Sequence, residues 1–180
     1  MANVKFTTGL SLLSYAHVLK PAETLNGDMK YSAALVFAKN SDTAKRAKEA
    51  VNKLMADDDV KKLLGKTKIK YELLRDGDEK DDEHYAGCYF INAKANEDHK
   101  PKVMDRDRVE IVDPNEIYSG CYVQAVLNLY AYNKNGNSGI GASLLGIRKI
   151  KDGEPLTGST VTDSDFDDSL LEGDGLDDLM

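Results

Sequence analysis

The sequence predicts a mainly β protein with one inserted helix, folded as a small closed or partly closed barrel. Three observations support this prediction: several apolar runs that alternate with polar residues, one long segment with helical spacing, and turns marked by Gly and Asn. A length of 180 residues fits one domain with an appendage, and 41% hydrophobic residues suffice for a core without disulfides.

The first strands come from the N-terminal residues. Residues 4–19 are apolar and rich in Thr and Ser, which predicts one bent strand or two short strands around Gly9. The Lys-Pro pair at 20–21 is expected to end this segment. The Asn-Gly-Asp turn signal at 26–28 introduces a further strand, Met29–Ala38.

The hydrophobic period then changes from strand to helix. Ser41 can cap a helix from 42 to about 64 that breaks near residues 57–59. Five residues at helical spacing form its expected buried stripe: Ala44, Ala47, Val51, Leu54 and Met55.

The middle of the chain is less regular. Residues 66–74 could form a strand, and the acidic segment 76–83 reads as a solvated loop. This loop does not fit a calcium site, because Lys80 and Asp81 stand where an oxygen ligand and a glycine are needed. A strand over 87–95 and a polar region with a short strand at 109–112 follow.

The strongest strand signal lies near the end of the body. Residues 120–132 alternate without interruption, residues 133–137 form a hairpin loop, and residues 140–150 return. Taken together, the elements favour an OB-type five-stranded barrel with long β-hairpins.

Charge divides the chain into two unlike parts. The net charge is −7, but residues 156–180 contain 8 acids and no Lys or Arg. Residues 1–155 hold all 24 bases and 23 acids, a net charge of +1. We therefore expect a folded domain over 1–155 and a disordered acidic C-terminal tail over 156–180. The alternative for the tail is a solubilising segment without a specific partner.

The long strand has two different faces. Its odd-numbered residues from Cys121 to Ala131 are apolar and predict the core side, whereas the even-numbered side from Tyr122 to Tyr132 is rich in Tyr and amides. In the 87–95 strand, polar Asn92 and Lys94 place Phe90 on the outer side as well. The alternative is that these rings are cross-strand packing pairs with their hydroxyls in water.

Aromatic rings interleaved with amides and cations suit single-stranded nucleic acid, because bases stack on rings while Lys and Arg contact phosphates. The expected stacking residues are Phe90, Tyr122, Tyr130 and Tyr132. The expected polar and phosphate contacts are Lys68, Lys70, Arg75, Asn92, Lys94, Lys102, Arg106, Gln124, Asn128, Arg148, Lys149 and Lys151.

Two stretches, residues 73–95 and 118–158, resemble the phage-encoded single-stranded DNA-binding proteins, with Gly-Cys-Tyr at 120–122 and Tyr-Asn-Lys-Asn-Gly at 132–136. The resemblance implies an OB fold that coats single-stranded DNA during phage replication or recombination. It also implies an acidic tail that contacts replication proteins and competes for the DNA groove, in a protein of the host cytoplasm. This chain departs from such proteins in having no Trp and in ending with Leu-Met. The expected partner-binding residues of the tail are Phe166, Asp177, Asp178, Leu179 and Met180.

Enzymatic readings find no support in the sequence. It has no phosphate-binding, nucleophile-elbow or zinc-protease motif, and we expect no enzyme activity, cofactor or metal. A zinc site would need His84, Cys88 and Cys121 to converge with another ligand, and a nuclease would need the acidic segment 76–83 to bind metals.

Two cysteines and no long apolar run fit a cytoplasmic protein without a membrane segment. The rival function is a protein-interaction module whose barrel face docks another protein, and a homodimer is left open.

Overall fold

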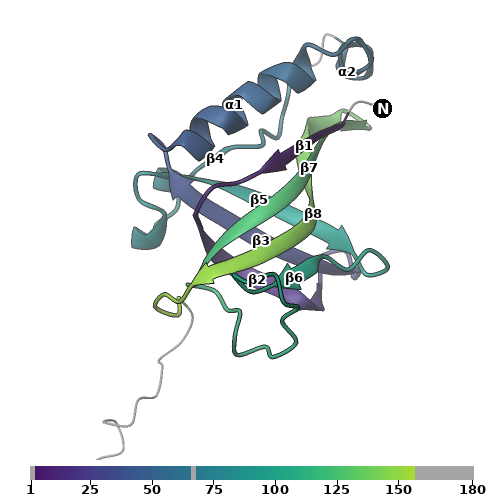
Figure 1. The fold of residues 1–180 in the computed structure, drawn as a ribbon. Helices are drawn as coiled ribbons and strands as arrows, with labels where there is room; N and C mark the ends of the chain where they lie inside the picture. The colour runs from purple at the N-terminus through teal and green to yellow at the C-terminus, as the bar shows by residue number, and fades with distance from the viewer. Residues whose placement is uncertain (1–2, 66–67, 157–180) are drawn as a thin grey trace, which may run out of the picture.

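The computed structural model describes residues 3–65 and 68–156 and has one curved, mostly antiparallel sheet with helices at one end (Figure 1). In chain order the elements are β1 Asn3–Thr7, β2 Ser11–Glu23, β3 Met29–Ala38, α1 Asp42–Met55, α2 Asp58–Leu64, β4 Arg75–Asp76, β5 Cys88–Asn96, β6 Lys102–Met104, β7 Tyr122–Lys134 and β8 Asn137–Lys151. Two short 3₁₀ turns, Gly77–Glu79 and Glu83–Tyr85, lie between β4 and β5.

Five strands close into a ring. β7 pairs with β2, β2 with β3, β3 with β5, β5 with β8, and β8 returns to β7. The β5–β8 junction is the weak seam of this ring, because it is parallel and consists of the single pair Lys94 and Ser143. β1, β4 and β6 extend the sheet from β7, β5 and β8 respectively. The predicted mainly β, five-stranded barrel with a helix inserted between strands is confirmed.

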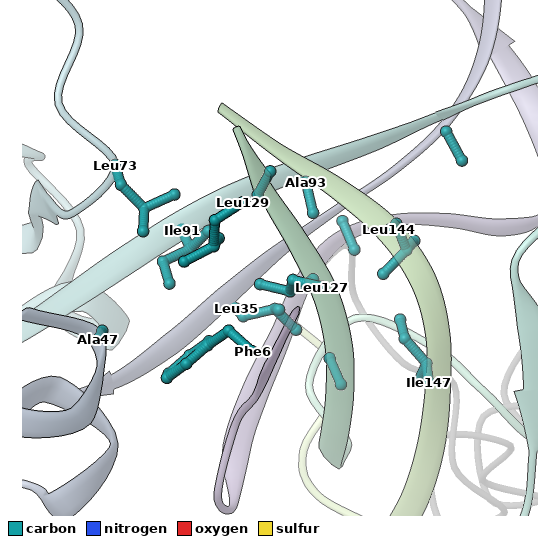
Figure 2. Packing of buried hydrophobic residues seen from close by; sticks show 14 of the residues in the cluster. Phe6, Leu35, Ala47, Leu73, Ile91, Ala93, Leu127, Leu129, Leu144 and Ile147 are labelled. Carbon is teal, nitrogen blue, oxygen red and sulfur yellow. The ribbon is translucent and has the colours of Figure 1, made fainter. Parts of the chain in front are cut away.

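The core fills the ring. Leu35, Ile91, Leu127 and Leu129 are fully buried and meet inside the barrel (Figure 2), and Leu13 belongs to the same cluster. These residues alternate with outward-facing neighbours along their strands, as the pleat requires. The apolar face predicted for the long strand is confirmed, since every odd residue from Cys121 to Ala131 is buried.

α1 closes one end of the barrel (Figure 1). The Oγ of Ser41 accepts a hydrogen bond from the Ala44 amide at 3.2 Å, which is the predicted N-cap. The helix is tied to the β1–β2 corner, where the Gly9 amide donates to the Thr43 hydroxyl at 2.9 Å. A Cβ at Gly9 would approach that hydroxyl to 2.7 Å, so only glycine fits this corner.

The acidic segment after β4 forms an ordered loop, which we call the acidic loop (76–87). Lys39 at the end of β3 bridges Asp76 and Asp78, each at 2.7 Å. Asp78 also accepts the Gly87 amide at 2.7 Å, and Tyr85 donates its hydroxyl to the Ser14 hydroxyl at 2.7 Å. The loop is therefore fastened to both β2 and β3.

Three details of the predicted elements are wrong. The first strand segment does not end at residues 20–21, because β2 continues to Glu23 and Pro21 falls where the β2–β3 register shifts. Residues 68–74 form no strand and only bridge β8 through Tyr71 and Gly139. The short strand is β6 at 102–104, whereas 109–112 contributes one bridging residue, Glu110.

Candidate nucleic-acid interface

The outer face of β7 carries the residues that the sequence singled out. Gln124, Asn128, Tyr130 and Tyr132 are all partly exposed and alternate with the buried core positions. The Tyr130 and Tyr132 rings lie 6.2 Å apart, centroid to centroid, at 49° to one another. The end of β7 next to the hairpin thus presents two neighbouring aromatic rings.

Two glycines of β8 make room for these rings. Tyr130 pairs with Gly141 and Tyr132 pairs with Gly139 across the hairpin. A Cβ at Gly141 would come within 2.7 Å of the Tyr130 ring, and one at Gly139 within 2.7 Å of the Tyr132 hydroxyl. Each ring therefore lies across the bare backbone of β8 instead of pointing straight into solvent.

Three connected grooves follow β8, and we call them together the β8 trough. The first, of about 580 Å³, lies between the Tyr130–Tyr132 pair and the outer face of β3 and β5. The second, of about 610 Å³, shares Lys30, Lys94 and Tyr130 with the first. The third, of about 320 Å³, shares Leu145 with the second and reaches β6 and β1. The trough thus crosses the β5–β8 seam of the barrel.

The charge of the trough is strongly one-sided. Among the described residues, Glu72 is the only acid that lines it. Nine cationic residues line it: Lys5, Lys30, Arg75, Lys94, Lys100, Lys102, Arg108, Lys134 and Arg148. Such a surface attracts an extended polyanion and releases its counterions.

Four tyrosines gather around the first groove: Tyr15, Tyr71, Tyr130 and Tyr132. Two cations flank Tyr71, with the Lys70 ammonium 5.4 Å and the Arg75 guanidinium 5.9 Å from its ring centroid. Burial, followed by the neighbouring Tyr130 and Tyr71, raises the pKa of Tyr132. Its phenol therefore stays neutral near pH 7 and adds no negative charge to the groove.

The structure brings together nine of the predicted site residues and leaves others outside. Those that line the trough are Arg75, Asn92, Lys94, Lys102, Gln124, Asn128, Tyr130, Tyr132 and Arg148. Those that do not line it are Lys68, Lys70, Phe90, Arg106, Tyr122, Lys149 and Lys151. Phe166, Asp177, Asp178, Leu179 and Met180 fall outside the described residues.

Two of the predicted contacts are already engaged within the protein. Lys149 forms an ion pair with Asp152 at 2.6 Å. Burial lowers its pKa, but the hydrogen bond and charge of Asp152 outweigh burial and hold the pKa above its ordinary value. Tyr122 lies at the opposite end of β7 from the hairpin, where the Lys151 ammonium is 4.8 Å from its ring centroid.

The expected exposure of Phe90 is wrong. Its side chain shares the outer side of β5 with Asn92 and Lys94, as predicted, but it is only 6% exposed. The acidic loop covers it, since Tyr85 packs edge-on against its ring at 5.2 Å. A base cannot stack on a ring that is covered in this way, and Phe90 packs instead with Val36 and Tyr85.

Sequence reasoning missed part of the trough. Tyr15, Lys30, Tyr71 and Lys134 line it without having been proposed, as do Lys5, Lys100 and Arg108. The position of the two glycines opposite the tyrosines could have been predicted from the sequence. A two-residue turn at Asn135-Gly136 pairs 134 with 137, and this register places Gly139 and Gly141 opposite the tyrosines.

The described residues can also be examined for metal ligands, reactive cysteines and membrane-spanning helices. Within residues 3–65 and 68–156, no three His, Cys, Asp or Glu side chains gather so as to hold a metal ion. Cys121 is buried inside the barrel, and Cys88 is half-buried on the outer side of β5. Neither helix of the described residues is long and apolar enough to cross a bilayer.

Comparison with known proteins gives a consistent picture. Residues 4–178 match the family model described as the single-stranded DNA-binding protein of Enterobacter phage Enc34. The chain is 39% identical over 106 residues to protein p50 of Acyrthosiphon pisum secondary endosymbiont phage 1. This match covers 57% of the chain and 56% of that protein, so little more than half of that relative's length is matched.

The fold of this chain is similar to those of several solved structures. The Enc34 protein in complex with single-stranded DNA superposes with a TM-score of 0.70 at 28% identity, covering 86% of this chain and 89% of that one. The same protein without its C-terminus gives a TM-score of 0.68 at 29% identity, covering 86% and 88%. The single-stranded DNA-binding protein gp2.5 of bacteriophage T7 shares the fold, with a TM-score of 0.62 at 15% identity over 93% and 94%.

Proposed function

The chain belongs to the family of the Enterobacter phage Enc34 single-stranded DNA-binding protein, and on this premise we propose that it binds single-stranded DNA along the β8 trough. Bases stack on the tyrosines of the first groove, and phosphates contact the cations along the trough. Binding is independent of sequence, because every base has a face on which a ring can stack.

The observation that supports this proposal best is the composition of the trough: nine cations, one acid and four tyrosines around one continuous surface. β8 runs along it from Ile140 to Arg148, which is about 26 Å at the rise of a β-strand. A surface of this length and charge suits an extended strand better than a compact ligand.

We further propose that the acidic tail has two roles. Its eight acids within residues 156–180 compete with DNA for the cationic trough, and the same segment recruits replication or recombination proteins. Competition follows from charge complementarity, since the trough is almost purely cationic and the tail is purely anionic. The protein acts in the cytoplasm of the phage-infected bacterium, where replicating DNA is exposed.

Titration of fluorescein-labelled oligo-dT against increasing salt tests the function. If about five of the nine cations engage phosphates, the logarithm of the affinity falls with the logarithm of salt concentration with a slope of about −3.5. Mixed-sequence oligonucleotides of equal length should bind within a few-fold of oligo-dT. No binding at low salt would refute DNA binding and favour a protein-docking barrel instead.

Substitution of single tyrosines tests the location. Tyr130→Ala and Tyr132→Ala should each weaken binding by about 1–3 kcal/mol with an unchanged salt slope, because stacking releases few counterions. Tyr122→Ala is the matched control, since Tyr122 lies on the same face of the same strand but outside the trough. An effect of Tyr122→Ala larger than that of either other variant would place the DNA elsewhere on β7.

A further inference from the structure

Lys80 of the acidic loop lies among three aromatic rings. Its ammonium is 4.7 Å from the ring centroid of Tyr15, 4.7 Å from that of Tyr85 and 4.9 Å from that of Phe90. Cations are attracted to ring faces at these distances. Within residues 3–65 and 68–156, no carboxylate lies within 4.0 Å of this ammonium, so the rings are its close partners.

The three rings differ in how firmly they are held. Tyr85 is completely buried, Phe90 is 6% exposed, and the two pack edge-on. Tyr15 is 57% exposed and belongs to the lining of the first groove. The ammonium of Lys80 therefore connects two fixed rings of the protein interior with one exposed ring of the proposed binding surface.

Tyr15 has an unusual backbone. It lies where the β2–β3 register shifts, between Ser14 and His17, and its φ is +48°. Non-glycine residues rarely adopt this region, and such positions gather at functional sites. The shift turns the Tyr15 side chain out of the regular alternation, so the strand alone does not fix where its ring lies.

The acidic loop helps to fix the position of the Tyr15 ring. Its base is fastened by the two Lys39 ion pairs, and the Tyr85 hydroxyl donates to the hydroxyl of Ser14, the residue before Tyr15. The loop thus holds Lys80 in a fixed place beside β2. With the Lys80 ammonium over the Tyr15 ring and more than half of the side chain exposed, ring surface remains on which a base can stack.

We propose that Lys80 is a positioning residue that holds Tyr15 as an additional base-stacking ring at the end of the first groove. This inference rests on the proposed DNA binding. Lys80 acts through Tyr15 and does not itself contact phosphate, so its charge contributes to affinity without releasing a DNA counterion.

A double-mutant cycle on the full chain tests the inference, with oligo-dT affinity measured at several salt concentrations. Tyr15→Ala should weaken binding roughly 5- to 100-fold, as the loss of one stacked base does. Lys80→Gln should weaken it about three- to tenfold with an unchanged salt slope, whereas Lys80→Arg should bind like the parent. The double variant Tyr15→Ala/Lys80→Gln should bind no worse than Tyr15→Ala alone.

Lys20→Ala is the matched control. Lys20 is an exposed lysine of β2, the strand that carries Tyr15, and it does not line the trough. Its affinity should equal that of the parent, and circular-dichroism melting confirms that each variant is folded.

Three results would overturn the inference. A slope reduced by about 0.7 in Lys80→Gln would make Lys80 a phosphate contact. Additive losses in the double variant would separate Lys80 from Tyr15, and parent-like binding of Lys80→Gln would remove it from the site. Failure of the parent to bind oligo-dT would instead refute the proposed function, so the two failures are distinguishable.

Discussion

Two glycines decide where the aromatic rings of the trough lie. At Gly139 and Gly141 the outer side of β8 has no side chain. The Tyr130 ring lies over Gly141, and the Tyr132 hydroxyl and the Tyr71 residue lie over Gly139. Alternation in the sequence was enough to find the tyrosines, because a strand with one apolar face has to turn the other outward. Alternation within one strand carries no information about the strand paired with it, so the glycines beneath the rings were not predicted.

Gly141→Ala should therefore weaken DNA binding without destabilising the fold. The new Cβ lies 2.7 Å from the Tyr130 ring and displaces it, which should weaken oligo-dT binding by about 1 kcal/mol, or roughly fivefold. Alanine costs less conformational entropy than glycine in a strand, so the melting temperature should stay the same or rise slightly.

Asn137→Ala is the control for this prediction, since Asn137 is an exposed residue of the same strand and lines none of the three grooves. Equal affinities for the Gly141→Ala variant and the parent would mean that the Tyr130 ring position does not matter for binding.

At the scale of elements, local signals succeeded and non-local contacts did not. β3, α1, α2 and β7 were predicted because caps, turns and periodicity lie within each segment. β6 has three residues and pairs with a strand more than forty residues away, so nothing in its own sequence marks it. The burial of Phe90 was missed for the same reason, because the covering loop is held by Lys39, far away in the chain.

The Lys39 clamp on the acidic loop should give stability that depends on pH. Hydrogen bonds from Lys39 and then from the Asp78 amide lower the pKa of Asp76, and hydrogen bonds from the Gly87 amide and then from Lys39 lower that of Asp78. Hydrogen bonds to both carboxylates raise the pKa of Lys39 above its ordinary value of 10.5. The clamp is thus fully present above the ordinary carboxyl value of 3.8 and below 10.5.

Melting curves of the parent and Lys39→Met across pH check this prediction. The variant should melt at a lower temperature between about pH 4 and pH 10. The difference should shrink as pH falls through the lowered Asp values, and again as pH rises through the raised Lys value. A difference that stays constant over the whole pH range would assign the effect to lost packing against Tyr89, whose ring centroid lies 5.5 Å from the Lys39 ammonium.

At the scale of the whole molecule, the net charge of −7 conceals a cationic surface. The body is nearly neutral overall, yet nine of its cations line one trough while its acids lie mostly elsewhere. Counting charges along the sequence distinguished the body from the tail, but it could not place the body's charges in space. The trough takes its cations from β1, β3, β4, β5, β6, β7, β8 and two loops. Only folding of the barrel brings these cations together on one surface.

Deleting residues 156–180 should raise the affinity for oligo-dT several-fold at low salt, because it removes eight negative charges that compete for the trough. The gain should shrink as salt screens the tail. A full-length variant with those acids changed to Asn or Gln is the control, since it keeps the chain length and should show the same gain. Unchanged affinity in both proteins would refute competition by the tail.

The most direct test of the account is to map where a single strand touches the protein. Oligo-dT would be photocrosslinked to the full chain at low salt, and the crosslinked peptides would be identified by mass spectrometry. We predict crosslinks at Tyr130 and Tyr132, with further ones at Tyr71 and Tyr15, all of which line the first groove. Crosslinks confined to Tyr122 or to α1, with the trough tyrosines unmodified, would contradict the claim that the β8 trough holds the DNA.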